Sequence, residues 1–223
     1  EQRGVDLNTV YSIHSGEIMG KVVGALETAL HGYNFLTTHY RSKQGWRHSV
    51  QRDGKGLDNR CDFYDQAFVV FAMAWLFQAS RDKQVLSLAE ETIDILDMTL
   101  LDKLNGGYKE GLDANGQMLQ QPRRQNPHMH LLEALLALYD ATTDSGYLDR
   151  AAQLITLAND KFIVDGTLRE YFTTSLKPVA SADGRLVEPG HHFEWVWLLY
   201  RYGELSDSLR ECTKIADRLY RFA

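Results

Sequence analysis

The chain has 223 residues, of which 44% are hydrophobic and 11% aromatic, and its formal net charge is −6. This length and composition suffice for one sizeable hydrophobic core. The longest run of Lys or Arg is the two-residue step Arg123–Arg124. A concentrated basic face for nucleic acid or an anionic membrane is therefore not expected.

Neither a membrane span nor a disulfide framework is predicted. The longest apolar run, residues 67–77, has 11 residues, whereas crossing a bilayer takes roughly 20. Only two cysteines occur, Cys61 and Cys212, without the spacing of metal ligands, which fits a reducing cytoplasm. The chain starts "EQRGVDLNTV", without a signal-peptide pattern or an initiating Met. We therefore expect that residue 1 is not the native start.

Two kinds of helix alternate along the chain. Four are amphipathic, with an apolar stripe opposite a charged face, as in helices that pack on a surface. They are predicted over residues 16–40, 82–101, 146–162 and 206–222. Three others are apolar nearly all round, which predicts buried, inner helices. These begin near Tyr64, His130 and His191.

A β-hairpin is predicted before each inner helix, so that one hairpin–helix unit is used three times. The units open at Gly45, Gly106 and Gly166, about 60 residues apart. Each unit contains an Asp-Gly or Asn-Gly step, which tolerates the positive φ angles of tight turns. The steps are Asp53-Gly54, Asn115-Gly116 and Asp183-Gly184. This alternation predicts an α/α barrel, and an odd number of helices leaves its ring open, so we expect a piece of a longer protein.

Histidine and glutamate recur three residues apart at the start of two inner helices, as His130 with Glu133 and His191 with Glu194. This spacing puts both side chains on one helix face. We expect each glutamate to hydrogen-bond an imidazole, fixing its tautomer and raising its basicity. Capping or packing is the simpler interpretation of one such pair. Two pairs at equivalent places in a repeat favour a functional site.

Other polar residues are given lesser roles. His128 and His192 are interpreted as secondary members of the site. The remaining histidines, interpreted as surface or structural groups, are His14, His31, His39 and His48. The pattern is not H-E-x-x-H and no third carboxylate lies nearby, so no metal site is expected. Glycosidase chemistry by paired carboxylates is an alternative, although histidines suit proton transfer near neutral pH better. Its candidates are Asp65, Glu170 and Glu188.

Three motifs resemble the N-acylglucosamine 2-epimerase superfamily, which includes cellobiose 2-epimerases and mannose isomerase-like aldose–ketose isomerases. The motifs are "YDQAFVVFAMA", "RQNPHMHLLEALLALYD" and "VEPGHHFEWVWLL". The resemblance covers essentially the whole chain. It implies an all-α (α/α)6 barrel of twelve helices, in which residues 1–223 form one domain lacking the first two and the last three. It also implies proton transfer at C2 of a reducing sugar through a cis-enediol, with histidines and no cofactor.

The resemblance also implies roles for individual residues. His191 matches a general acid/base with Glu194 on its helix, and His130 matches a histidine near the reacting oxygens. Asn126 matches a partner of a sugar hydroxyl. Further pocket residues are expected to be Tyr64, Glu133, Phe193 and Trp195, with core packing an equal alternative for the last two. The family's second acid/base histidine and its substrate-binding arginine lie in segments absent from this sequence, so the chain alone is not expected to be active.

The expected substrate is a free monosaccharide, because the bulk of Trp195 would crowd an N-acyl group or a second sugar ring. An aldose–ketose isomerase of the mannose/fructose type is therefore predicted. The alternatives are an N-acylglucosamine 2-epimerase or related 2-epimerase and, in another class, a non-catalytic helical toroid that binds a sugar or a protein. No nucleic-acid or membrane partner is expected, and a homodimer is one candidate state. The pair Arg123–Arg124 is interpreted as a solvated face rather than a phosphate site, and His191→Ala is expected to abolish turnover at nearly unchanged thermal stability.

Overall fold

The computed structural model of the chain describes residues 24–223. Internal contacts divide these residues into two compact units. The first contains the described residues up to Leu101 together with Glu110–Leu119, and the second contains Asp102–Lys109 and Gln120–Ala223. No helix in the described part of the chain is long and apolar enough to cross a membrane. Residues 16–23 of the first predicted helix, and His14, lie outside the described residues.

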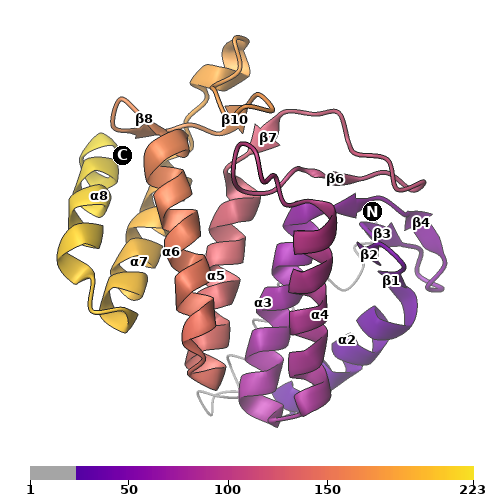
Figure 1. Ribbon diagram of the computed structural model, residues 1–223. Helices are drawn as coiled ribbons and strands as arrows, with labels where there is room; N and C mark the ends of the chain where they lie inside the picture. The colour runs from indigo at the N-terminus through magenta and orange to yellow at the C-terminus, as the bar shows by residue number, and fades with distance from the viewer. Residues whose placement is uncertain (1–23) are drawn as a thin grey trace. The chain divides into compact units, whose positions relative to one another are not determined.

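The first unit contains one predicted inner helix and two outer helices, in the predicted order. They are α2 (Ala25–His39), α3 (Phe63–Ser80) and α4 (Lys83–Thr99). Eleven of the 18 residues of α3 are buried, and α3 packs against α4 as an antiparallel hairpin (Figure 1). Short antiparallel strand pairs join the helices. They are β1 (Arg41–Ser42) with β2 (Gly45–Trp46), β3 (Ser49–Val50) with β4 (Gly56–Asp58), and β5 (Cys61–Asp62) with β6 (Gly111–Leu112).

The second unit contains two inner helices, each followed by an outer helix. The helices are α5 (Asn126–Thr142), α6 (Ser145–Leu157), α7 (Pro189–Leu205) and α8 (Leu209–Phe222). A π-helical turn over Ala158–Phe162 extends α6. The strands are β7 (Arg123–Arg124) paired with β10 (Tyr171–Phe172), and β8 (Ile163–Val164) paired with β9 (Thr167–Leu168). The pairs α5–α6 and α7–α8 pack as helical hairpins (Figure 1).

Helix α5 begins earlier than its sequence pattern predicts. The helix was expected to start near His130, but Asn126 is its first residue and Pro127 lies in its first turn. Proline is favoured there because its missing N–H is one that a first turn leaves unbonded. His130 therefore lies in the second turn of α5, whereas His191 lies in the first turn of α7. The two His–Glu pairs do not occupy equivalent helical positions.

One buried side chain in each repeat bridges the inner helix to the hairpin before it. These bridging residues are Gln66, His128 and His192, and none of them is exposed. Each accepts a backbone N–H from the hairpin, at 2.9, 2.9 and 3.1 Å respectively. Each also donates to the carbonyl four residues earlier on its own chain. A buried amide N–H needs such a partner, so the bridging residues fix the hairpin on the helix.

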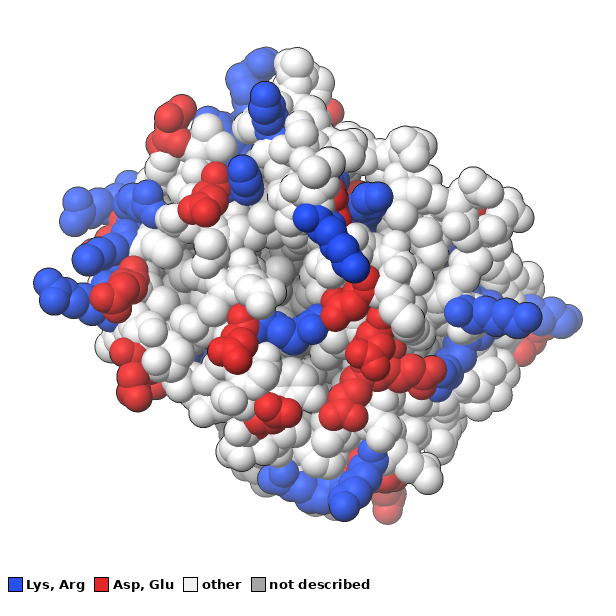
Figure 2. All heavy atoms as spheres, viewed as in Figure 1, with Lys and Arg blue, Asp and Glu red and all other residues white. Residues whose placement is uncertain are grey.

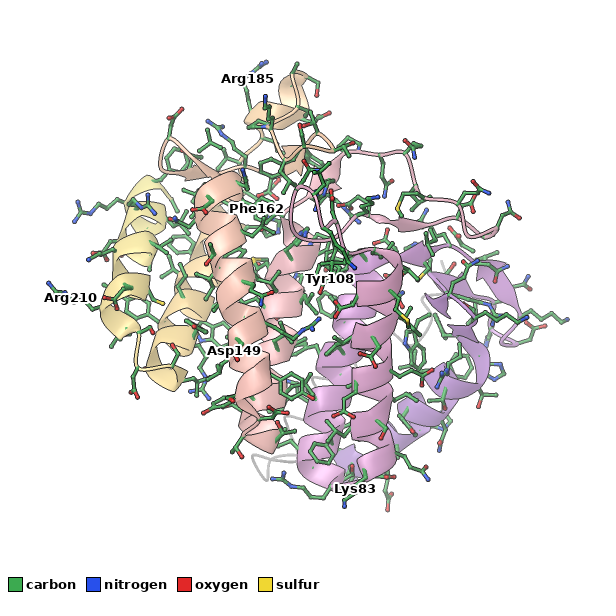
Figure 3. The ribbon with its side chains drawn as sticks, viewed as in Figure 1. Lys83, Tyr108, Asp149, Phe162, Arg185 and Arg210 are labelled. Atoms are coloured by element: carbon green, nitrogen blue, oxygen red, sulfur yellow. The ribbon has the colours of Figure 1, made fainter. Side chains whose placement is uncertain are left out.

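His128 is therefore a structural residue rather than a secondary member of a site. Its Nδ1–H donates to Arg124 O at 2.9 Å, and its Nε2 accepts the N–H of Tyr108. The rings of Tyr108 and Phe162, both labelled in Figure 3, lie 6.2 and 5.2 Å from the imidazole. Burial lowers the pKa of His128 to about 3, so this histidine is neutral at physiological pH. His192 makes the equivalent contacts with Glu188 and Leu168.

The turns from inner to outer helix also repeat. The residue directly after α3 is Arg81, with φ 56°. The residue directly after α5 is Thr143, with φ 62°. Both lie in the left-handed region of backbone conformations, which residues other than glycine adopt at a cost in free energy. The next residues, Asp82 and Asp144, cap the following helix by accepting a backbone N–H at 2.8 and 2.9 Å.

The hairpin of the third repeat turns at a different place from the one predicted. Asp183-Gly184 lies in a 3₁₀ turn over Ala182–Arg185 rather than in a hairpin. The hairpin turn is formed earlier, where Thr173 and Lys177 are hydrogen-bonded and Leu176 has φ 58°. Glycine occupies that position in the other two repeats, as Gly54 and Gly116. The Leu176 side chain is buried, and this burial offsets its backbone strain.

Arg123 is buried, contrary to its interpretation as part of a solvated face. The residue is 3% exposed and its guanidinium lies 3.1 Å from the carboxylate of Asp102. The same guanidinium donates to the carbonyl oxygens of Gly106, Tyr108 and Thr174. With its donors committed in this way, Arg123 holds the loop before α5 and is not available to a phosphate.

Acidic and basic side chains are mixed on the face shown in Figure 2. Acidic groups gather over α4, whose sequence contributes Glu90, Glu91, Asp94 and Asp97, and basic groups are scattered elsewhere on this face. The view agrees with the absence of long basic runs in the sequence.

Candidate active site

The candidate site lies in the second unit, where α5 and α7 are in contact. A small, partly open hollow lies between side chains of the two helices. Its lining residues are Met129, His130 and Glu133 from α5 and Glu194, Trp197 and Leu198 from α7. Three of the predicted site residues therefore meet at this hollow: His130, Glu133 and Glu194.

His130 and Glu133 form the hydrogen-bonded pair that their spacing predicts. His130 Nδ1 lies 3.2 Å from Glu133 Oε2, and the two side chains are 12% and 23% exposed. A carboxylate accepts the Nδ1–H, so the proton of a neutral His130 is held on Nδ1. The imidazole is thereby oriented in the wall of the hollow.

His191 is bonded to a different carboxylate from the one predicted. Glu194 makes no hydrogen bond to His191 among the described residues. Instead, His191 Nδ1 lies 3.0 Å from Oε1 of Glu170, a residue between β9 and β10. The Glu170 side chain is 5% exposed, whereas the imidazole is 24% exposed. A buried carboxylate thus supports a partly accessible histidine at the amino end of α7.

Gln125, which the sequence did not single out, and Trp195, which was expected to line the pocket, complete this arrangement. Gln125 precedes α5, is fully buried, and its amide nitrogen lies 3.0 Å from Oε2 of Glu170 and 3.2 Å from His191 Nδ1. The indole N–H of Trp195 donates to the amide oxygen of Gln125 at 2.7 Å. Trp195 is 1% exposed, so it is buried and holds Gln125 rather than lining an open pocket. The bulk of Trp195 therefore cannot exclude an N-acyl group or a second sugar ring from the pocket, and the prediction of a free monosaccharide loses this support.

Nearby acids make His191 more basic. Its hydrogen bond to Glu170 is the main cause that raises the pKa of His191, and burial opposes this effect. The charges of Glu170, Glu194 and Glu188 raise the pKa further. Glu194 therefore acts on His191 through charge. An imidazole that gains a proton more readily is a better general base near neutral pH.

The other predicted site residues are placed as follows. Asn126 is the first residue of α5, and its buried Oδ1 has no hydrogen-bond partner in the described part of the chain. Phe193 is 48% exposed and its ring contacts Tyr220. Tyr64 lies in the first turn of α3, in the other compact unit, so its place beside a sugar stays a prediction. Trp197, 55% exposed, is the aromatic residue at the hollow.

The described helices form part of an (α/α)6 barrel fold. The cellobiose 2-epimerase structure from Bacillus thermoamylovorans B4167 is similar to this chain with a TM-score of 0.87 and 21% sequence identity, over 96% of this chain and 58% of that one. Seven α-helices of such a barrel, α2 to α8, are described here.

The chain belongs to the N-acylglucosamine 2-epimerase (GlcNAc 2-epimerase) family, whose model matches residues 9–223. The mannose-6-phosphate isomerase of Rhizobium meliloti (strain 1021) is 34% identical over 174 residues, which cover 75% of this chain and 43% of that protein. The cellobiose 2-epimerase of Dictyoglomus turgidum is 28% identical over 202 residues, which cover 83% of this chain and 50% of that protein. The chain spans about half the length of these relatives.

Proposed function

We propose that the protein to which this chain belongs interconverts an aldose and a ketose of the mannose/fructose type by proton transfer at C2. The observation that carries the proposal is the imidazole of His191, bonded to a buried carboxylate at the amino end of α7 in a chain of this family. The 34% identical relative is named a mannose-6-phosphate isomerase, which supports the aldose–ketose outcome. The epimerase-named relative and the family description make a sugar 2-epimerase the second candidate.

In the proposed reaction, His191 accepts the proton on C2 of the aldose. The electron pair of that C–H bond forms a C1–C2 double bond, and O1 gains a proton from an acid, which gives a cis-enediol. Loss of the O2 proton with protonation of C1 gives the ketose. Loss of the O1 proton with protonation of C2 on its opposite face gives the epimer instead. An imidazole suits both transfers because its pKa lies near neutral pH.

The sugar is proposed to lie against the α5–α7 hollow. His130, held by Glu133, would face the reacting oxygens, and the unpaired Oδ1 of Asn126 would accept a sugar hydroxyl. A buried carbonyl oxygen without a partner costs free energy that a bound hydroxyl recovers. The exposed indole of Trp197 offers an apolar wall for one face of the ring.

Several features of the whole protein belong to the same proposal. The resemblance implies that a second acid/base histidine and a substrate-binding arginine lie outside residues 1–223. It also implies that these residues and the present chain belong to one barrel domain. A cytoplasmic location is supported by two free, buried cysteines, Cys61 and Cys212. A homodimer is the proposed assembly to test by light scattering.

The test is proton NMR of the protein at its natural length with D-mannose in D2O. Fructose would support the proposal, and a His191→Gln variant should then produce none. Glucose alone, with deuterium at C2, would support the epimerase. D-Mannose 6-phosphate and N-acetylmannosamine are tested in parallel, and no product from any of the three sugars would refute the isomerase proposal in favour of a non-catalytic binding role.

A further inference from the structure

We propose that Glu170, oriented by Gln125 and Trp195, is a positioning residue that keeps the proton of neutral His191 on Nδ1 and leaves Nε2 to exchange a proton with the substrate. The proposal rests on the function proposed above, because it assigns the atom of His191 that acts. In the second unit, Trp195, Gln125 and Glu170 are hydrogen-bonded in that order, and Glu170 bonds to His191.

Trp195 fixes the orientation of the Gln125 amide. An indole N–H can only donate, so the atom 2.7 Å from it must be the amide oxygen. The NH2 group of Gln125 therefore faces Glu170 and His191. Both Gln125 and Trp195 are buried, at 0% and 1% exposure, so water does not compete for these bonds.

The carboxylate of Glu170 then determines the tautomer of His191. Its Oε2 accepts from Gln125 at 3.0 Å, and its Oε1 lies 3.0 Å from His191 Nδ1. Nδ1 could either donate to Glu170 or accept from Gln125, which lies 3.2 Å away. A hydrogen bond to an ionised carboxylate is roughly twice as strong as one between neutral groups. Nδ1 therefore carries the proton, and the lone pair of neutral His191 is on Nε2.

The other nitrogen of His191 is left available. No group in residues 24–223 forms a hydrogen bond with Nε2, and the imidazole is 24% exposed. When Nε2 takes up a proton, the ring becomes positively charged beside the Glu170 carboxylate, which stabilises it. The charged groups that act on His191 are Glu170 from the hairpin, Glu188 just before α7 and Glu194 in α7. The uncharged Gln125, just before α5, is also in contact with it.

The first repeat contains the same contact with acid and base exchanged. There, His48 comes from the hairpin and Asp65 from the first turn of α3, with Nδ1 and Oδ2 2.7 Å apart. The Nε2 of His48, however, lies 2.7 Å from the guanidinium of Arg60 and is occupied. Two carboxylate–imidazole pairs thus join a hairpin to an inner helix in the described residues, and of these two, the pair at His191 has the unoccupied Nε2. This difference distinguishes a working base from a structural pair.

The first experiment measures the tautomer and the pKa of His191 by 15N NMR of the histidine-labelled chain, with His191→Gln to assign its signals. We expect the Nδ1–H tautomer above the pKa. Glu170→Gln should lower the pKa of His191 by about one unit or more, because an opposite charge at hydrogen-bond distance is lost. Glu188→Gln is the matched control, since it removes an exposed carboxylate that acts on His191 through charge and not through a side-chain hydrogen bond. Its effect should be clearly smaller.

The second experiment uses kinetics of the protein at its natural length. Glu170→Gln should lower kcat by about 10–100-fold with KM little changed, and move the acidic limb of the kcat/KM profile to lower pH. Glu170→Asp should recover part of the loss, and Trp195→Phe should weaken the preference for the Nδ1–H tautomer. An Nε2–H tautomer in the unmodified chain, or an unchanged pKa in Glu170→Gln, would overturn the proposal. The NMR result needs no turnover, so inactivity on every sugar would refute the proposed function alone.

Discussion

Replacing His128 by glutamine should make the protein less sensitive to acid. In the folded chain His128 bridges α5 to the loop at Tyr108, and burial lowers its pKa from 6.5 to about 3. Gln66 makes the same two kinds of hydrogen bond in the first repeat and does not titrate. His128→Gln therefore keeps the bridge and removes the titrating group.

The size of the effect follows from the difference in pKa between the two states. As pH falls below 6.5, the unfolded chain binds a proton at His128 that the folded chain does not bind, so stability is lost with falling pH. At pH 5 the loss is about 2 kcal/mol, and it reaches about 4 kcal/mol at pH 3, at about 1.4 kcal/mol per pKa unit. His128→Gln should lose some ring packing against Phe162, about 1–2 kcal/mol at pH 7, and regain about 2 kcal/mol of relative stability at pH 5.

The assay is urea unfolding at pH 7 and pH 5, with the free energy of unfolding compared between His128→Gln and the unmodified chain. The control is His31→Gln, which replaces an exposed histidine and should leave the pH dependence unchanged. Parallel losses of stability in the unmodified chain and in His128→Gln would refute the reasoning, because they would mean that His128 takes up its proton while folded.

Three further substitutions test other parts of the structure. Arg123→Met leaves Asp102 buried without its cation, and we expect a loss of about 3–5 kcal/mol in urea unfolding; a loss below 1 kcal/mol would contradict the buried ion pair. Thr143→Asn relieves a β-branched residue at φ 62°, and should raise stability by about 0.5–1 kcal/mol, or Tm by about 1–4 °C; a lower Tm would argue against strain there. His191→Ala should abolish turnover and also cost about 1–3 kcal/mol, because Glu170 stays buried after losing its partner. Unchanged stability, as expected from the sequence alone, would mean that water replaces the imidazole.

Much of the helical architecture could be predicted because its signals are local. Hydrophobic periodicity distinguished inner from outer helices, and Asp53-Gly54 and Asn115-Gly116 form the predicted turns, with φ of 84° and 81° at their glycines. The third turn was misplaced because Leu176 has no intrinsic preference for the left-handed region. Only its burial, a tertiary effect, places it there.

The site could be predicted less completely, because its supports come from residues distant in the sequence. The pair His130–Glu133 follows from spacing on one helix. Glu170 was considered only for glycosidase chemistry, yet a signal was present. The hairpin sequences at residues 45–48, 107–110 and 167–170 are "GWRH", "GYKE" and "TLRE", so that Glu170 aligns with His48. Each of these two residues is hydrogen-bonded to a side chain in the first turn of the next inner helix. Gln125 had no such signal, since a buried amide resembles any loop glutamine until its partners are known.

Two inner helices are each hydrogen-bonded at the amino end to the hairpin that follows them, so these bonds form only after the later hairpin has been translated. The N–H of Phe63 at the start of α3 bonds to the carbonyl of Glu110, and the N–H of Gln125 before α5 bonds to that of Glu170. Gln125 and Glu170 are 45 residues apart. At 5–20 residues per second, a ribosome needs roughly 2–9 s to supply the second partner after the first. During that interval the N–H of Gln125 lacks the carbonyl that it bonds in the folded chain, so this end of α5 is completed only by residues translated later.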